Sequence, residues 1–145
     1  MNKKYENMRK CISILYRQFQ IYINNNTKDL GISASEYIFL MEMYKNDSMS
    51  QEQLSKNLII DKAATARSIK SLEQKGYIVR NKDENDKRTN RIKLTKKGIE
   101  IKERLEQLFE KWNDIVADDV DNDSLNLVMD VINHMSIKAI EINKI

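Results

Sequence analysis

Cationic side chains interleaved with small ones are the feature of this sequence with the clearest chemistry. Lys62, Arg67 and Lys70 recur at helical spacing, and Ala63 and Ala66 can share their face. Lysine and arginine bind phosphates, arginine also binds base edges, and alanine lets a helix approach a groove closely. We therefore expect this face to bind nucleic acid. An ordinary solvated surface helix is the alternative.

A second cationic group lies in the polar stretch 80–90 and just beyond it. Lys87 and Arg88 lie beside Asp86, and Arg91 follows in the next apolar run. A carboxylate next to an arginine can hold the guanidinium in one orientation, so we expect Asp86 to aim Arg88 at DNA. The alternative is a flexible loop of mixed charge.

Catalytic, cofactor and metal chemistry find little support in the sequence. The chain has one Cys and one His, no glycine-rich phosphate loop and no His-Glu-x-x-His motif, whereas zinc sites and most catalytic sites need several such groups. We expect no enzyme activity, no cofactor and no metal site. Cys11 lies next to an apolar stripe, so we expect a buried, inert thiol rather than a redox-active one.

The net charge of +3 hides an uneven distribution along the chain. Residues 1–50 carry 7 basic and 5 acidic side chains, residues 51–97 carry 13 and 6, and residues 98–145 carry 5 and 11. A basic segment between nearly neutral and acidic ones is typical of a nucleic-acid-binding face. A solvated lysine-rich surface has the same pattern, so charge alone leaves both interpretations open.

The elements that must hold these residues are mostly helical. The 145 residues suffice for one domain with a core, and the absence of proline favours long helices and argues against an all-β sandwich. Apolar residues in steps of three and four predict a first helix that ends at Gly31. Ser33 with Glu36, and Ser50 with Gln53, have the capping-box spacing and predict two further helix starts.

A helix-turn-helix with a β-hairpin is predicted for the middle of the chain. A tight connection at residues 59–62 leads to a helix that Asp61 can cap and that Gly76 can end. Two short β-type runs, 77–79 and 91–94, then bracket the charged stretch as the strands of a hairpin do.

The last third of the chain predicts two long helices, one capped by Thr95 and one by Asp121 or Asp123. Their apolar stripes exceed what a small core can cover, so we expect them to pack with the first helix of a second copy in a homodimer. No run of about 18 apolar residues and no apolar leader is present. We expect a soluble, cytoplasmic protein without a membrane partner.

Residues 61–80 closely resemble the recognition helix and following strand of MarR-family transcriptional regulators. Asp83, the run 86–88 and the Leu-Thr-Lys-Lys-Gly stretch at 94–98 are similar to the wing signature of that family. The resemblance implies a mainly α fold with a small β-hairpin, a winged helix-turn-helix with N- and C-terminal dimerisation helices.

The implied organisation is a single domain over residues 1–145. The DNA-binding lobe would span 32–98, and the dimerisation helices would span 1–31 and 99–145. The resemblance further implies a homodimeric regulator, most often a repressor, that binds palindromic double-stranded promoter DNA. Its recognition helix would enter the major groove and its wing the minor groove.

The resemblance implies roles for individual residues, according to their positions in the motif. Arg67 matches the arginine of the recognition helix, Arg88 that of the wing, and Asp86 the acidic residue that braces the wing. Ala63 and Ala64 offer only methyl groups where the family often has Ser or Thr. The predicted DNA-binding residues are Lys62, Ala63, Ala66, Arg67, Lys70, Asp86, Lys87, Arg88 and Arg91.

Members of the family commonly respond to small aromatic or phenolic effectors, which bind between the dimerisation helices and the DNA-binding lobe. The resemblance implies such a pocket lined by Phe19, Tyr37, Met41 and Trp112. Aromatic and methionine side chains at helical spacing are more often core residues, which is the alternative. For the whole protein, the alternative is a winged-helix adaptor that binds protein partners and no DNA.

Overall fold

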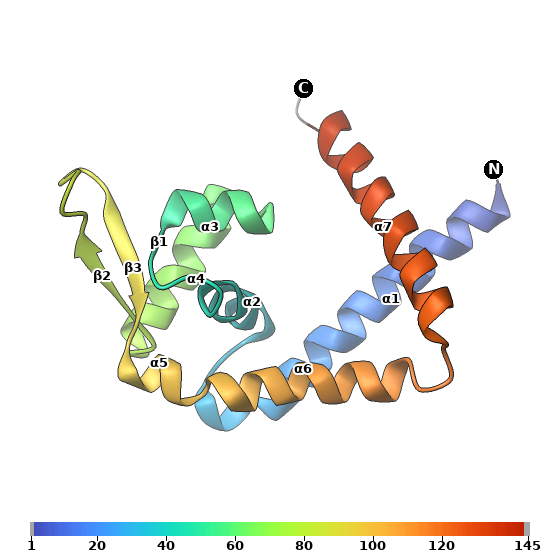
Figure 1. Cartoon of the computed structure of the whole chain (residues 1–145), viewed down its shortest axis with the longest axis horizontal. Helices are drawn as coiled ribbons and strands as arrows, with labels where there is room; N and C mark the ends of the chain where they lie inside the picture. The colour runs from blue at the N-terminus through green and yellow to red at the C-terminus, as the bar shows by residue number, and fades with distance from the viewer. Residues whose placement is uncertain (1, 144–145) are drawn as a thin grey trace. The chain divides into compact units, whose positions relative to one another are not determined.

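The structure is a computed structural model that describes residues 2–143. In chain order its elements are α1 (Lys3–Asn26), the 3-10 helix η1 (Lys28–Leu30), α2 (Ala34–Met43), β1 (Met49–Ser50), α3 (Gln51–Leu58), α4 (Lys62–Gln74), β2 (Ile78–Lys82), β3 (Asn90–Leu94), α5 (Lys96–Glu100), α6 (Lys102–Val116) and α7 (Asn122–Ile142) (Figure 1). Two compact units, Met1–Glu110 and Lys111–Ile145, divide the chain. The predicted fold class, mainly α with a small β-hairpin, is confirmed.

Side chains at the helix starts explain where the helices of the first unit begin. In α2 the Ser33 hydroxyl accepts from the Glu36 N–H at 3.3 Å, while the Glu36 carboxylate accepts from the Ser33 N–H at 2.8 Å. Ser50 and Gln53 form the same reciprocal pair at the start of α3. Asp61 caps α4. Both predicted capping boxes and the predicted N-cap are confirmed.

The core of the first unit lies where α2, α3, α4 and the sheet meet. Leu40 from α2, Leu54 from α3, Ile69 from α4 and Ile92 from β3 are all at most 1% exposed. Burial stabilises each such side chain by about 1.5–3 kcal/mol relative to exposure. Ile23, near the end of α1, joins the same cluster.

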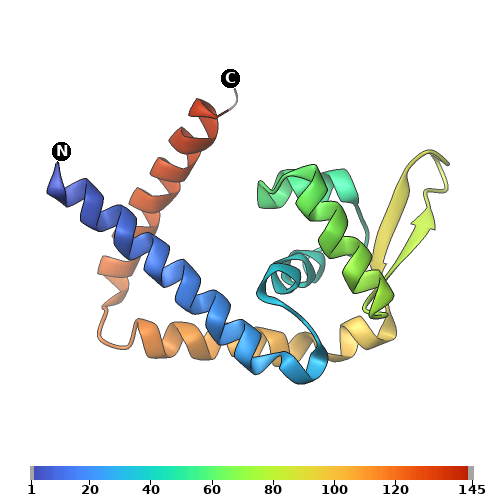
Figure 2. The ribbon, with the colours of Figure 1, turned by 180° about the vertical axis from the view of Figure 1, so that it is seen from behind.

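The strands form an antiparallel three-stranded sheet in the order β1-β3-β2. Ile78 of β2 pairs with Leu94 of β3, and Met49 of β1 pairs with Ile92. The hairpin of β2 and β3 was expected, but β1 was not, because a strand of two residues carries no alternation to detect. Figure 2 shows α3 and α4 joined by a short turn, with the β2–β3 hairpin beside α4.

The first helix ends earlier than the sequence predicts. Helix α1 stops at Asn26, and η1 fills the interval to Gly31. The buried Thr27 hydroxyl explains the change, because it lies 2.8 Å from the Ile23 carbonyl and 2.6 Å from the Ile32 carbonyl. The hydroxyl thereby ties the last turn of α1 to Ile32 and fixes the turn that follows.

The predicted single helix after Thr95 is wrong, because the chain forms α5 and α6 with a break at Ile101. The Tyr44 hydroxyl donates to the Gly98 carbonyl at 2.8 Å. In a continuous helix that carbonyl would accept from the N–H four residues later. The hydrogen bond from Tyr44 therefore favours the break.

Gly98 is buried where α5 passes over the end of α4. A Cβ at this position would overlap the backbone carbonyl of Tyr77, so only glycine fits. This close approach explains the glycine in the Leu-Thr-Lys-Lys-Gly stretch on packing grounds.

Candidate nucleic-acid interface

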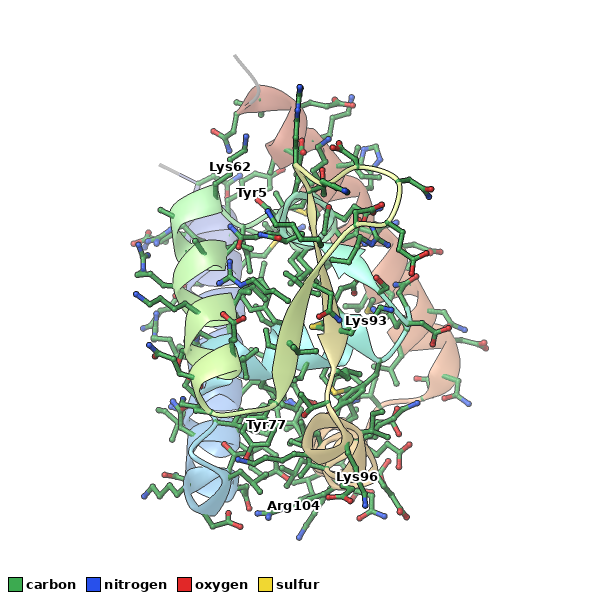
Figure 3. The ribbon with its side chains drawn as sticks, turned by 90° about the vertical axis from the view of Figure 1, so that its left-hand side faces the viewer. Tyr5, Lys62, Tyr77, Lys93, Lys96 and Arg104 are labelled. Atoms are coloured by element: carbon green, nitrogen blue, oxygen red, sulfur yellow. The ribbon has the colours of Figure 1, made fainter. Side chains whose placement is uncertain are left out.

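Helix α4 has one buried and one exposed face. Thr65, Ile69 and Leu72 are buried. On the other side Lys62, Ala63, Arg67 and Lys70 are exposed and Ala66 is half-buried. Figure 3 shows Lys62 at one end of α4 and Tyr77 just beyond the other, where the chain enters β2. The structure thus brings the five predicted residues of this helix to one accessible face.

The exposed cations of this face and of the wing tip, residues 83–89, are free of acidic partners in the described part of the chain. Among residues 2–143, no carboxylate lies within 4.0 Å of the charged groups of Lys62, Arg67, Lys70, Lys87 or Arg88. The positive charge is therefore available to an external anion such as a DNA phosphate.

The turn before α4 is tightly specified. Ile59 adopts the left-handed conformation, with φ 54° and ψ 45°. The Ser55 hydroxyl donates to the Ile60 carbonyl at 2.6 Å, and the Ile60 N–H donates back to the Ser55 carbonyl at 3.1 Å. These bonds and the Asp61 cap fix the direction in which α4 leaves α3.

An ion pair between a buried carboxylate and a half-buried lysine holds the other end of α4. Lys75 donates to both carboxylate oxygens of Glu36, which is only 3% exposed. Burial raises the pKa of Glu36, but hydrogen bonds from Lys75, Ser71 and Ser33 outweigh it and leave that pKa below its usual range. The sequence shows the capping box of Glu36 but not its partner, which is 39 residues away.

Aspartates organise the tip of the wing, residues 83–89. Asp83 accepts from the N–H groups of Asn85 and Asp86, at 2.8 and 3.2 Å, and these bonds lower its pKa. Asp86 accepts from the Arg88 N–H at 3.0 Å and from the Thr89 hydroxyl at 3.2 Å. The predicted brace is thus wrong in detail, because Asp86 holds the backbone of Arg88 rather than its guanidinium.

Arg88 lies near the start of α3. With Arg80 and Asn90 of the hairpin and Gln51 and Glu52 of α3, it lines an open hollow of about 330 Å³. Arg80 itself pairs with Glu73 at 3.1 Å. Sequence reasoning did not single out Arg80.

Arg91 differs from the other predicted DNA-binding cations because its guanidinium is held within the protein. It donates to the hydroxyl and carbonyl of Ser48 at 3.0 and 2.7 Å, and to Gln53 at 3.1 Å. Its side chain is 29% exposed. No periodicity in the sequence relates Arg91 to Ser48.

Of the predicted effector residues, three pack with the core of the first unit. Tyr37 is 2% exposed, its hydroxyl donates to the Leu105 carbonyl at 3.2 Å, and burial raises its pKa to about 12. Phe19 meets Tyr37 edge to face, with ring centroids 6.0 Å apart, and Met41 packs against the same cluster. Trp112 belongs to the second unit. The effector pocket stays a prediction.

The terminal helices carry exposed apolar side chains. In α1, ahead of its buried Ile23, Ile12 is 47% and Leu15 51% exposed, and in α7 Ile132 is 40% exposed. No described residue of α7 is buried. Cys11 is exposed as well. The prediction of a buried thiol is therefore wrong, because this part of α1 lies well before Ile23, where the helix joins the core.

No helix among residues 2–143 is long and apolar enough to cross a membrane.

Comparisons with known proteins agree with this geometry. The model of the MarR family matches residues 32–89. The HTH-type transcriptional regulator BilQ of Clostridioides difficile (strain CD3) is 32% identical over 112 residues, which cover 77% of this chain and 76% of the relative.

Solved structures match the fold over most of the chain. A MarR transcriptional regulator from Methanosarcina mazei Go1 is 35% identical, with a TM-score of 0.84, over 94% of this chain and 99% of that one. A mutant MarR from E. coli, solved in complex with operator DNA, has a TM-score of 0.81 at 22% identity, over 91% and 95% of the two chains. From the identity to these relatives and the shared winged helix-turn-helix, we conclude that the chain belongs to the MarR family of transcriptional regulators.

Proposed function

We propose that this protein is a homodimeric repressor that binds palindromic promoter DNA in the cytoplasm and releases it in response to a small aromatic or phenolic effector. Helix α4 enters the major groove, and the tip of the wing enters the adjacent minor groove. The observation that carries the proposal is the exposed, unpaired cationic face of α4 next to a wing that presents Lys87 and Arg88. The fold shared with the operator-bound E. coli protein supports it.

The residues divide into two roles under this proposal. Arg67 and Lys70 contact base edges and phosphates from α4, where Ala63 and Ala66 allow close approach. Lys62 and Lys87 contact phosphates, and Arg88 enters the minor groove. Asp86 acts indirectly, through the hydrogen bond that fixes the Arg88 backbone.

Homodimerisation follows from the exposed apolar residues of α1 and α7. Palindromic DNA presents two equivalent half-sites, which a two-fold symmetric dimer matches. The apolar rows supply a surface that a second copy can cover in the same way. The DNA-binding lobe, 32–98, and the dimerisation segments, 1–31 and 99–145, remain the proposed division of the chain.

Salt dependence of binding to the DNA upstream of the protein's own gene tests the proposal. Affinity should fall steeply with salt, with a slope of about −0.9 for each phosphate neutralised. Arg67→Ala and Arg88→Ala should each weaken binding and reduce the magnitude of that slope by about 1 if they contact phosphate. Lys28→Ala, which removes an exposed cation of η1, is the control.

If the affinity changes neither with salt nor in Arg67→Ala and Arg88→Ala, the proposal of DNA binding is rejected. The protein would then act through other partners, as the adaptor alternative requires.

A further inference from the structure

The guanidinium of Arg91 joins three separate parts of the DNA-binding lobe. Arg91 lies on β3, and its Nε and Nη2 donate to Ser48, in the loop before β1. Its Nη1 donates to Gln53 in the first turn of α3. Its Nε also lies 3.8 Å from the carboxylate of Asp83 at the base of the wing tip.

The partners of Arg91 are themselves fixed in place. The Gln53 side-chain oxygen that Arg91 contacts also accepts from the Ser50 N–H at 2.8 Å, as part of the capping box of α3. Asp83 holds the wing tip through the N–H groups of Asn85 and Asp86. Arg91 therefore connects the helix-turn-helix to the wing tip through groups that cannot move independently.

This arrangement requires an arginine in particular. Donors point from Nε, Nη1 and Nη2 in fixed directions, at 3.0, 3.1 and 2.7 Å from their acceptors. A lysine keeps the charge but has a single nitrogen, so it cannot reach the same three groups. Lys93 lies two residues further along the same strand and lines, with Arg91, Ser48 and Asp83, a second open hollow. It makes no such contacts and is exposed; Figure 3 labels it on β3.

We propose that Arg91 is a positioning residue that fixes the wing relative to α3 and α4, so that Arg88 is presented to DNA together with the α4 face. This inference rests on the proposed function. It reassigns Arg91 from a DNA contact to a support of one. Binding constellations lose affinity when the residues that support them are loosened by about 1 Å.

The affinity for operator DNA of two variants, Arg91→Lys and Arg91→Gln, tests the proposal. Lys93→Gln is the matched control. Both Arg91 variants should weaken binding about tenfold, the cost of a lost arginine contact. Lys93→Gln removes one charge from the same strand and should leave affinity near the wild-type value. Full affinity of Arg91→Lys would overturn the proposal, because a direct phosphate contact needs only the charge.

Combining Arg91→Lys with Arg88→Ala separates positioning from direct contact. If Arg91 acts by positioning the wing tip, the Arg91→Lys change should cost clearly less affinity once Arg88 is absent, because only the Lys87 contact then remains to be displaced. A loss that adds in full to that of Arg88→Ala would overturn the proposal, because the two residues would then act independently.

Hydrogen exchange of the wing-tip amides gives a readout that needs no DNA. The N–H groups of Asn85, Asp86 and Arg88 should exchange faster in Arg91→Lys than in the wild type or in Lys93→Gln, because the Asp83 turn loses its support. Unchanged exchange would overturn the positioning role. The two proposals can also fail separately. If exchange is faster in Arg91→Lys but the wild-type protein shows no salt-dependent DNA binding, the proposed function fails while the role of Arg91 in fixing the wing tip stands.

Discussion

Lys75 donates to both carboxylate oxygens of Glu36, at 2.7 and 2.8 Å, and so joins the first turn of α2 to the end of α4. Glu36 also accepts from the N–H and hydroxyl of Ser33. One carboxylate thus caps α2 and anchors the helix that carries the proposed DNA-binding face. The pair is structural, and it ties the end of α4 to the start of α2.

Lys75→Met should destabilise the protein by about 3 kcal/mol at pH 7, because it leaves a buried carboxylate uncompensated. The double variant with Glu36→Gln should recover part of that loss. Urea unfolding followed by circular dichroism measures both. Lys56→Met is the control, since its pair with Glu52 is exposed on both sides and should contribute less than about 1 kcal/mol. Equal effects of the two lysine variants would show that the buried carboxylate of Glu36 does not depend on Lys75.

The same pair predicts a dependence of stability on pH. Because the pKa of Glu36 in the folded protein lies below its ordinary value of 4.5, its contribution is complete above that pH and is lost as pH falls through the lower folded value. The difference in unfolding free energy between wild type and Glu36→Gln should therefore shrink below pH 4.5. Urea unfolding at pH 7, 4.5 and 3.5 measures it, and a constant difference would contradict the assignment.

Gly98→Ala should destabilise the protein by about 3 kcal/mol, because the added methyl overlaps the Tyr77 carbonyl and neither backbone can move cheaply. Gly76→Ala provides a comparison, since its surroundings are open and its cost comes only from a φ of 79°. That cost is about 1 kcal/mol. Thermal unfolding ranks the two, and a milder effect at Gly98 would contradict the close contact.

Local signals in the sequence predicted most of the fold. Capping residues sit within four positions of the groups they bind, so Ser33, Ser50 and Asp61 could each be assigned from neighbours alone. The break at Ile101 could not, because the hydrogen bond that favours it comes from Tyr44, which is 54 residues from Gly98. Long-range bonds of this kind leave no periodic trace in the chain.

The candidate site shows the same division. Helical spacing correctly placed Arg67 and Lys70 on an exposed face. Charge type alone made Arg91 look equivalent to Arg88, although Arg91 is bound to Ser48, 43 residues earlier. Which cations are free and which are held inside the lobe is a property of tertiary contacts.

Ile59→Asn should stabilise the protein by about 1 kcal/mol. Ile59 is 63% exposed and has a φ of 54°, so little apolar burial is lost, whereas asparagine tolerates the left-handed conformation far better than a β-branched residue. Ile59→Ala keeps the conformational cost and serves as the control. Urea unfolding measures both variants, and an asparagine variant no more stable than the alanine one would show that the turn holds no such strain.

Ile132→Asp should convert the proposed dimer to a monomer, because it places a charge within the apolar row of α7. Sedimentation at micromolar protein should give the 17.1 kDa mass of one chain, against twice that mass for the wild type. Asn126→Asp adds the same charge to the same helix at a polar position and should remain dimeric. A wild-type protein that sediments as a monomer would reject the dimer. A dimeric Ile132→Asp with unchanged circular dichroism would show that this row of α7 is not the interface. Loss of operator binding in the monomer, with an intact α4 face, would show that both half-sites must be bound at once.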